Sequence, residues 1–159
     1  MNLYHGSNSV IETPDLKRSR KELDFGMGFY TTTNYEQAVQ FTEKVVERKG
    51  GSKIVSIYDF NIEKLQEFKI LKFEEPNEKW LKFVSDNRNF VPLQEDYDII
   101  IGPVANDDVF RTLVLYFSGE LSVSDTLERL KIKKLFNQYV FKNDIVLKQL
   151  NFVKAEFVK

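Results

Sequence analysis

Cysteine is absent from the 159-residue chain, and histidine occurs once. Without a thiol there is no disulfide framework, no thiolate nucleophile and no cysteine-based zinc site. A single imidazole does not make a buried transition-metal site, so we expect no metal. The remaining candidate ligands are mainly carboxylate and carbonyl oxygens, which suit only a hard cation. The composition therefore favours chemistry that needs neither sulfur nor a bound metal.

A long apolar run is also missing. No segment reaches membrane-spanning length, and the first five residues lack the basic and apolar blocks of a signal peptide. The 23 basic and 24 acidic side chains nearly cancel, so no global field attracts or repels nucleic acid, although a local basic strip could still bind it. We expect a cytoplasmic protein with no membrane partner.

Apolar and aromatic residues, by contrast, are plentiful at 42% and 14% of the chain. This composition argues against disorder and allows one domain, residues 1–159, with a sizeable core. Segments with strand and helix patterns interleave without a regular βαβ period, which predicts a mixed α+β fold. Strands are predicted at 2–4 (ending at Gly6), 29–33, 53–60, 68–73, 97–104, 137–141 and 155–158, and helices after Asn34, Pro76, Asp107 or Asp108, and Ser124.

Two N-terminal segments are candidates for ligand binding. In the first, His5 ends a predicted strand beside Gly6, whose missing Cβ lets a ligand approach the backbone closely. In the second, residues 24–32, two glycines precede an aromatic strand without forming a dinucleotide fingerprint. Both also have an ordinary interpretation: a half-exposed histidine before a turn, and a glycine-rich turn that leads into core aromatics.

A third candidate segment, residues 136–141, places Gln138 among alternating aromatic residues. Taken alone, Gln138 is read as an outward-facing residue on an edge strand. In this order, however, the three segments resemble the ADP-ribosyltransferase superfamily of the diphtheria-toxin and poly(ADP-ribose) polymerase type. Members of that superfamily carry a His–Tyr–Glu triad, and the matching positions here are His5, Tyr30 and Gln138. The resemblance spans nearly the whole chain.

More narrowly, the chain is similar to a bacterial family of small transferase-like domains. These share the stretch at residues 24–32 and an Asp-x-Ile-Ile-Gly-Pro-Val-Ala strand and loop, here residues 98–105. Members are often encoded as toxins beside a small partner gene. The resemblance therefore implies a bacterial toxin–antitoxin system with a small antitoxin protein as partner.

The resemblance also implies a fold and a substrate. The fold would be an α+β, split two-sheet core with peripheral helices and an NAD cleft between the sheets. His5 would bond the adenosine ribose, Gly6 would hold the nicotinamide carboxamide through its backbone, and Tyr30 would stack on the nicotinamide ring. Phe41 would cover the other face of that ring. The residues implied in NAD binding are His5, Gly6, Ser7, Gly28, Tyr30 and Phe41, and those implied in catalysis are His5, Tyr30 and Gln138.

Gln138 departs from the superfamily pattern. An amide can bond the ribose hydroxyl as a glutamate does, but it cannot act as a base. Either another carboxylate (Asp24, Asp107 or Asp108) moves the proton, or the acceptor needs little activation, as a nucleobase amine would. Asp107 and Asp108 also suit a helix cap.

The expected activity is transfer of ADP-ribose from NAD to RNA, DNA or protein. NAD hydrolysis, and NAD binding with little or no turnover, stay open as alternatives. A basic cluster in the loop after the first strand suits a phosphate backbone, although a charged loop is more often simply solvated. Its members are Lys17, Arg18, Arg20 and Lys21.

Overall fold

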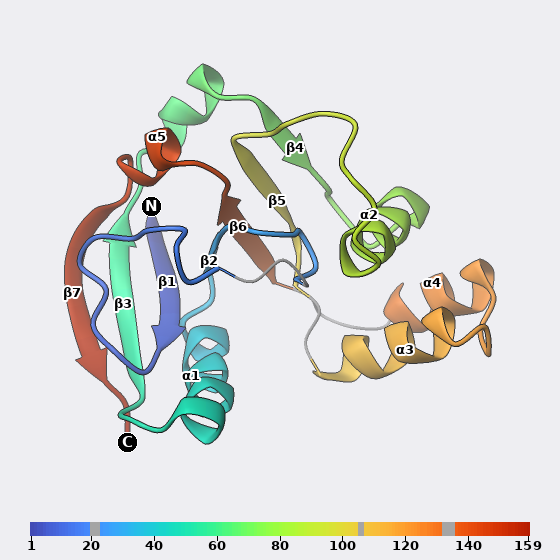
Figure 1. Ribbon diagram of the computed structural model, residues 1–159, viewed down its shortest axis with the longest axis horizontal. Helices are drawn as coiled ribbons and strands as arrows, with labels where there is room; N and C mark the ends of the chain where they lie inside the picture. The colour runs from blue at the N-terminus through green and yellow to red at the C-terminus, as the bar shows by residue number, and fades with distance from the viewer. Residues whose placement is uncertain (20–22, 105–106, 132–135) are drawn as a thin grey trace.

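The computed structural model describes residues 1–19, 23–104, 107–131 and 136–159, and the side chains of Asp107 and Asp108 lie outside this description. The described strands form a mixed seven-stranded sheet in the order β4-β5-β6-β2-β1-β3-β7 (Figure 1). The strands are β1 (Asn2–Ser7), β2 (Phe29–Thr32), β3 (Ile54–Asp59), β4 (Ile70–Lys72), β5 (Ile99–Pro103), β6 (Asn137–Phe141) and β7 (Asn151–Phe157). The helices are α1 (Tyr35–Lys49), the 3₁₀ helix η1 (Ile62–Glu67), α2 (Glu78–Arg88), α3 (Asp107–Phe117), α4 (Val123–Lys131) and α5 (Asp144–Leu147).

The predicted α+β class is confirmed, but the expected pair of sheets is replaced by one hydrogen-bonded sheet. The joint between its two halves is narrow, because β1 and β2 are in register at one residue pair, Tyr4 with Thr32. Figure 1 shows β7, β3 and β1 on one side of this joint and β2, β6, β5 and β4 on the other. The seven strands therefore form one hydrogen-bonded sheet, but its two halves are joined through a single residue pair.

The two faces of the sheet carry different cores. One face, called the continuous face here, has a single apolar cluster that extends across the joint, with Leu3, Phe29, Tyr58 and Ile99 among its members. The opposite face, called the divided face, has two clusters. Under α1, the first packs Ala38 on Val55 and Ile57. Under α2, α3 and α4, the second packs Trp80, Leu113 and Leu130 on Ile100 and Val140.

Local signals explain the helix ends near the joint. Helix α1 begins where predicted, with the Asn34 Oδ1 accepting a hydrogen bond from the Gln37 amide at 2.8 Å, and it ends at Gly50 with φ of 71°. The predicted cap Ser124 of α4 is wrong. Ser122 caps this helix instead, because its hydroxyl accepts from the Asp125 amide (3.1 Å) and donates to the Asp125 carboxylate (2.8 Å).

The first strand was expected to end at Gly6, but β1 continues to Ser7. Gly6 is aligned with Val55 of β3, and a Cβ at this position would lie 2.1 Å from the Ala38 carbonyl oxygen. A glycine here thus allows the backbone of α1 to contact the sheet. The last strand is longer than predicted, at Asn151–Phe157. No helix in the described ranges is long and apolar enough to cross a membrane.

Candidate functional site

A cavity of about 1330 Å³ lies where β1 and β2 separate. Its walls come from β1 and the segment that follows it, from β2, from α1 and from the start of β6. This volume exceeds the roughly 300–1,000 Å³ of common small-ligand pockets, so the cleft has room for an extended ligand. The cleft gathers every site residue expected from the sequence: His5, Gly6, Ser7, Gly28, Tyr30, Phe41 and Gln138.

The backbone of Gly6 faces this gap. Met1 and Phe60 exchange both backbone hydrogen bonds, each at 2.9 Å. Such pairs alternate along an antiparallel ladder, so the odd-numbered residues of β1 bond β3 and the even-numbered residues face β2. Tyr4 meets Thr32, and the β1–β2 register ends there. The amide and carbonyl of Gly6 therefore point toward the space between the strands.

His5 lies across the gap from the other candidate side chains. It shares the continuous face with Leu3, two residues earlier, and stacks on Phe29 with ring centroids 4.3 Å apart. Its Nδ1 is 2.7 Å from the Tyr30 carbonyl oxygen. Since a carbonyl only accepts, Nδ1 carries the proton and Nε2 is an acceptor. Burial lowers the pKa of His5, which favours this neutral form.

Tyr30 forms a fixed aromatic wall on the divided face. Its hydroxyl donates to the Gly26 carbonyl at 2.6 Å and accepts from the Phe25 amide at 3.0 Å. Burial, and then the nearby charge of Asp24, raise the pKa of Tyr30 well above its ordinary value. The hydroxyl therefore anchors the ring and does not serve as an acid or a base near neutral pH.

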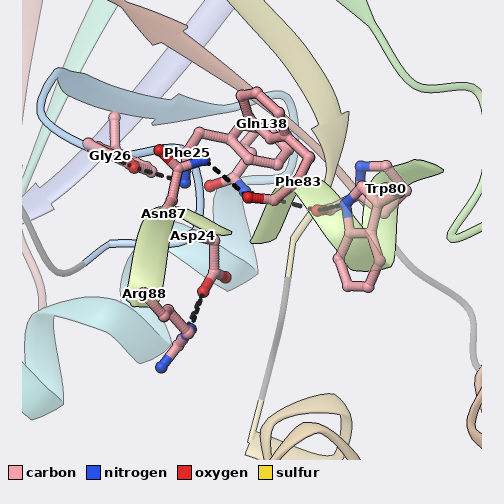
Figure 2. A network of polar contacts seen from close by, with 10 residues as sticks. Asp24, Phe25, Gly26, Trp80, Phe83, Asn87, Arg88 and Gln138 are labelled. Carbon is pink, nitrogen blue, oxygen red and sulfur yellow. Dashed lines mark hydrogen bonds and ion pairs between the residues drawn. The ribbon is translucent and has the colours of Figure 1, made fainter. Parts of the chain in front are cut away.

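The sequence context of Gln138 suggested a surface residue, but the structure buries it. Strand β6 lies between β5 and β2, and Gln138 is only 5% exposed. Its Nε2 donates to the Pro103 carbonyl at 3.4 Å, and the Trp80 indole donates to the same oxygen at 3.3 Å (Figure 2). Every fully buried side-chain nitrogen or oxygen in the described part of the chain has a hydrogen-bond partner. No described donor bonds the Gln138 Oε1, so this acceptor is not completely buried, and Gln138 lines the cleft.

The strand register brings two of the three triad positions together. Tyr30 is aligned with Val140, and Gln138 precedes Val140 by two residues on the same face. The two side chains are thus diagonal neighbours, about 7 Å apart at Cβ. His5 lies on the other face and bonds the main-chain carbonyl of Tyr30.

The other expected binding residues contribute in different ways. The hydroxyl of Ser19 accepts from the Gly28 amide (2.7 Å) and donates to its carbonyl (2.9 Å), so the Gly28 backbone already has partners. A Cβ on Gly28 would also lie 2.5 Å from Val140 Cγ1, which is a packing reason for this glycine. Ser7 is buried, whereas Phe41 on α1 is 42% exposed and offers an aromatic surface to the cleft.

Of the alternative carboxylates, Asp24 lines the cleft and forms an ion pair with Arg88. The Arg88 Nε is 2.8 Å from Asp24 Oδ1, and Nη2 contacts the same oxygen. The guanidinium also lies over Phe110, 4.7 Å from the ring centroid. Sequence reasoning missed Arg88, because no motif distinguishes it from other basic residues on helix surfaces.

The basic cluster is only partly described. Arg18 lines the cleft and Lys17 is exposed, while Arg20 and Lys21 lie outside the described residues. Ala105, the last residue of the Asp-x-Ile-Ile-Gly-Pro-Val-Ala stretch, also lies outside them. In the described ranges, no three His, Cys, Asp or Glu residues gather into a group that could hold a metal ion.

Residues 1–152 match the model of one protein family, described as a protein of unknown function, DUF3990. No curated protein and no solved structure matches the chain. The matched range contains β1 to β6, all of the cleft residues named above, and the Asp24–Arg88 pair. The chain therefore belongs to the DUF3990 family.

Proposed function

We propose that this chain is an ADP-ribosyltransferase that binds NAD in the cleft between β1 and β2 and transfers ADP-ribose to a macromolecule. The observation that carries this proposal is the convergence of the three sequence motifs on that cleft. The backbone of Gly6 faces the gap, the ring of Tyr30 forms one wall, and Gln138 presents an acceptor oxygen. We further propose that the single sheet with its narrow joint corresponds to the split core of the transferase type.

The chemistry suits these groups. The bond between the nicotinamide nitrogen and the ribose C1′ breaks, and its electron pair leaves with nicotinamide. The acceptor then bonds C1′ of the oxocarbenium-like sugar and releases a proton. Gly6 would hold the carboxamide, and the ring of Tyr30 would stack on nicotinamide, with Phe41 on the other side. The neutral His5 would accept a ribose hydroxyl hydrogen at Nε2.

Gln138 would stabilise the sugar without moving a proton. Its Oε1 can accept a hydrogen bond from a ribose hydroxyl, and its partial negative charge lies near the developing cation. Because an amide is no base, the acceptor must lose its proton to solvent or to another group. A nucleobase amine meets that requirement, and we propose RNA or DNA ahead of protein as the acceptor class.

One observation supports a second candidate, NAD hydrolysis or NAD binding with little turnover. Asp24, a carboxylate in the cleft, is engaged in an ion pair with Arg88. With Gln138 in the triad position, neither group activates an acceptor strongly. Release of free nicotinamide separates a hydrolase from a binding module, and transfer of label to a macromolecule separates a transferase from both.

The cellular role rests on the family resemblance alone. We propose a cytoplasmic bacterial toxin whose activity is blocked by a small antitoxin protein.

The test uses NAD labelled in its adenosine half, incubated with the purified chain and a cell lysate. Nuclease and protease digestions then show which class of macromolecule carries the label. Tyr30→Ala should abolish nicotinamide release, because the stacking wall is lost. Tyr97→Ala is the matched control, since Tyr97 does not line the cleft. If the unmodified chain neither binds NAD nor releases nicotinamide, the proposed function is wrong.

A further inference from the structure

Arg88 is held in the wall of the cleft by two neighbours that leave part of its guanidinium unused. Asp24 bonds the edge formed by Nε and Nη2, and both contacts reach the same carboxylate oxygen. Phe110 of α3 lies against the flat face. The side chain is 25% exposed, compared with 11% for Asp24, so the guanidinium is the more accessible member of the pair.

A guanidinium has five N–H donors and can form a second fork at the end that carries Nη1 and Nη2. No other described group bonds this end of Arg88, and the residue lines the cleft. The ion pair and the ring contact fix the plane of the guanidinium, which reduces the entropy lost when a ligand binds. Figure 2 shows the Arg88 side chain against Asp24.

We infer that Arg88 is a phosphate-binding residue of the cleft, with Asp24 and Phe110 as its positioning residues. Two phosphate oxygens match the open fork of a guanidinium. The ligand class is a nucleotide that carries a pyrophosphate. This inference rests on the proposed function for the identity of that nucleotide as NAD, while the phosphate contact itself depends only on the geometry of Arg88.

The test compares three ligands by calorimetry: NAD, nicotinamide and inorganic pyrophosphate. Arg88→Lys keeps the charge but loses the fork, and the double variant Asp24→Asn/Arg88→Gln leaves no buried unpaired carboxylate. Arg111→Lys, an exposed position on α3 that does not line the cleft, is the matched control. Both cleft variants should weaken NAD binding by about ten- to a hundredfold, the usual value of a charge-assisted hydrogen bond. Nicotinamide, which has no phosphate, should bind as before.

Unchanged NAD affinity in both cleft variants would overturn the inference while leaving the proposed function intact. If the unmodified chain does not bind NAD, the proposed function fails and pyrophosphate decides the role of Arg88. Pyrophosphate binding that is lost in both cleft variants but kept in Arg111→Lys supports the contact. Absent or Arg88-independent pyrophosphate binding would then refute it.

Discussion

Replacing Gln138 by glutamate tests whether the site is built for an amide. In the structure the Gln138 Nε2 is a donor, and it faces the Pro103 carbonyl at 3.4 Å. Gln138→Glu changes almost no volume but removes this donor. A carboxylate oxygen would then face a carbonyl oxygen, at a position only 5% exposed.

Both the repulsion and the burial disfavour the charged carboxylate and raise its pKa above the unfolded value of about 4.3. The lost hydrogen bond, together with the unpaired carboxylate oxygen that replaces the donor, costs about 2 kcal/mol, although Trp80 still donates to Pro103. At 1.36 kcal/mol per unit this corresponds to a pKa raised by about 1.5, to roughly 6 in the folded variant. The protonated carboxyl can donate to Pro103. The variant should therefore lose unfolding free energy in full above pH 6, and this loss should disappear as the pH falls toward 4.

The measurement is urea unfolding of the wild type and Gln138→Glu between pH 4.5 and 8. Gln66→Glu, an exposed position in η1, is the control and should show no such pH dependence. Nicotinamide release should be sustained or raised at neutral pH, because the charged carboxylate then lies near the developing oxocarbenium. A difference in stability that is absent, or that does not change with pH, would refute the role of the Pro103 contact.

Four other outcomes are expected. Gly6→Ala should destabilise the chain by about 3 kcal/mol or more in urea unfolding, because the added Cβ would meet a backbone carbonyl at 2.1 Å; a loss under 1 kcal/mol would contradict that contact. Tyr30→Phe should keep NAD affinity within a few fold but lower stability by about 1–3 kcal/mol, since its two hydrogen bonds to residues 25 and 26 are lost. Burial lowers the pKa of Lys142 to about 8, so the unfolded chain binds more protons between pH 8 and 10.5. Wild-type stability should therefore rise with pH in this window relative to Lys142→Met, and parallel profiles would contradict it. NAD turnover should survive exhaustive EDTA dialysis, and activity that returns only on addition of a metal would count against the metal-free expectation.

Much of the local structure could be predicted from the sequence. The strand at residues 137–141 and the helix after Asn34 depend on alternation and capping, which are short-range signals. The strand order could not be predicted in the same way, because it depends on contacts between distant segments. The insertion of β6 between β5 and β2 is one such contact, and it makes Gln138 buried where its local context suggests exposure.

The candidate site shows the same division. Motifs could select His5, Tyr30 and Gln138, and the structure gathers them around one cleft. Only the register shows that His5 projects from the opposite face to the other two. Arg88 was beyond prediction, because its role depends on a carboxylate 64 residues away in the chain. The catalytic roles of His5, Tyr30 and Gln138 stay predictions.

The central place of β6 has a consequence for synthesis on the ribosome. Strand β2 is complete at Thr32, yet its neighbour β6 begins at Asn137. Strand β5 also pairs with β6, and β3 pairs with β7 at Asn151–Phe157, so both are synthesised before these partners. A nascent chain that stops before β6 therefore lacks Gln138 and the strand that hydrogen-bonds to β2, whatever local helices it has formed. The cleft is completed only when β6 has emerged, so a partner that recognises the finished cleft can bind only a chain whose synthesis has passed Phe141.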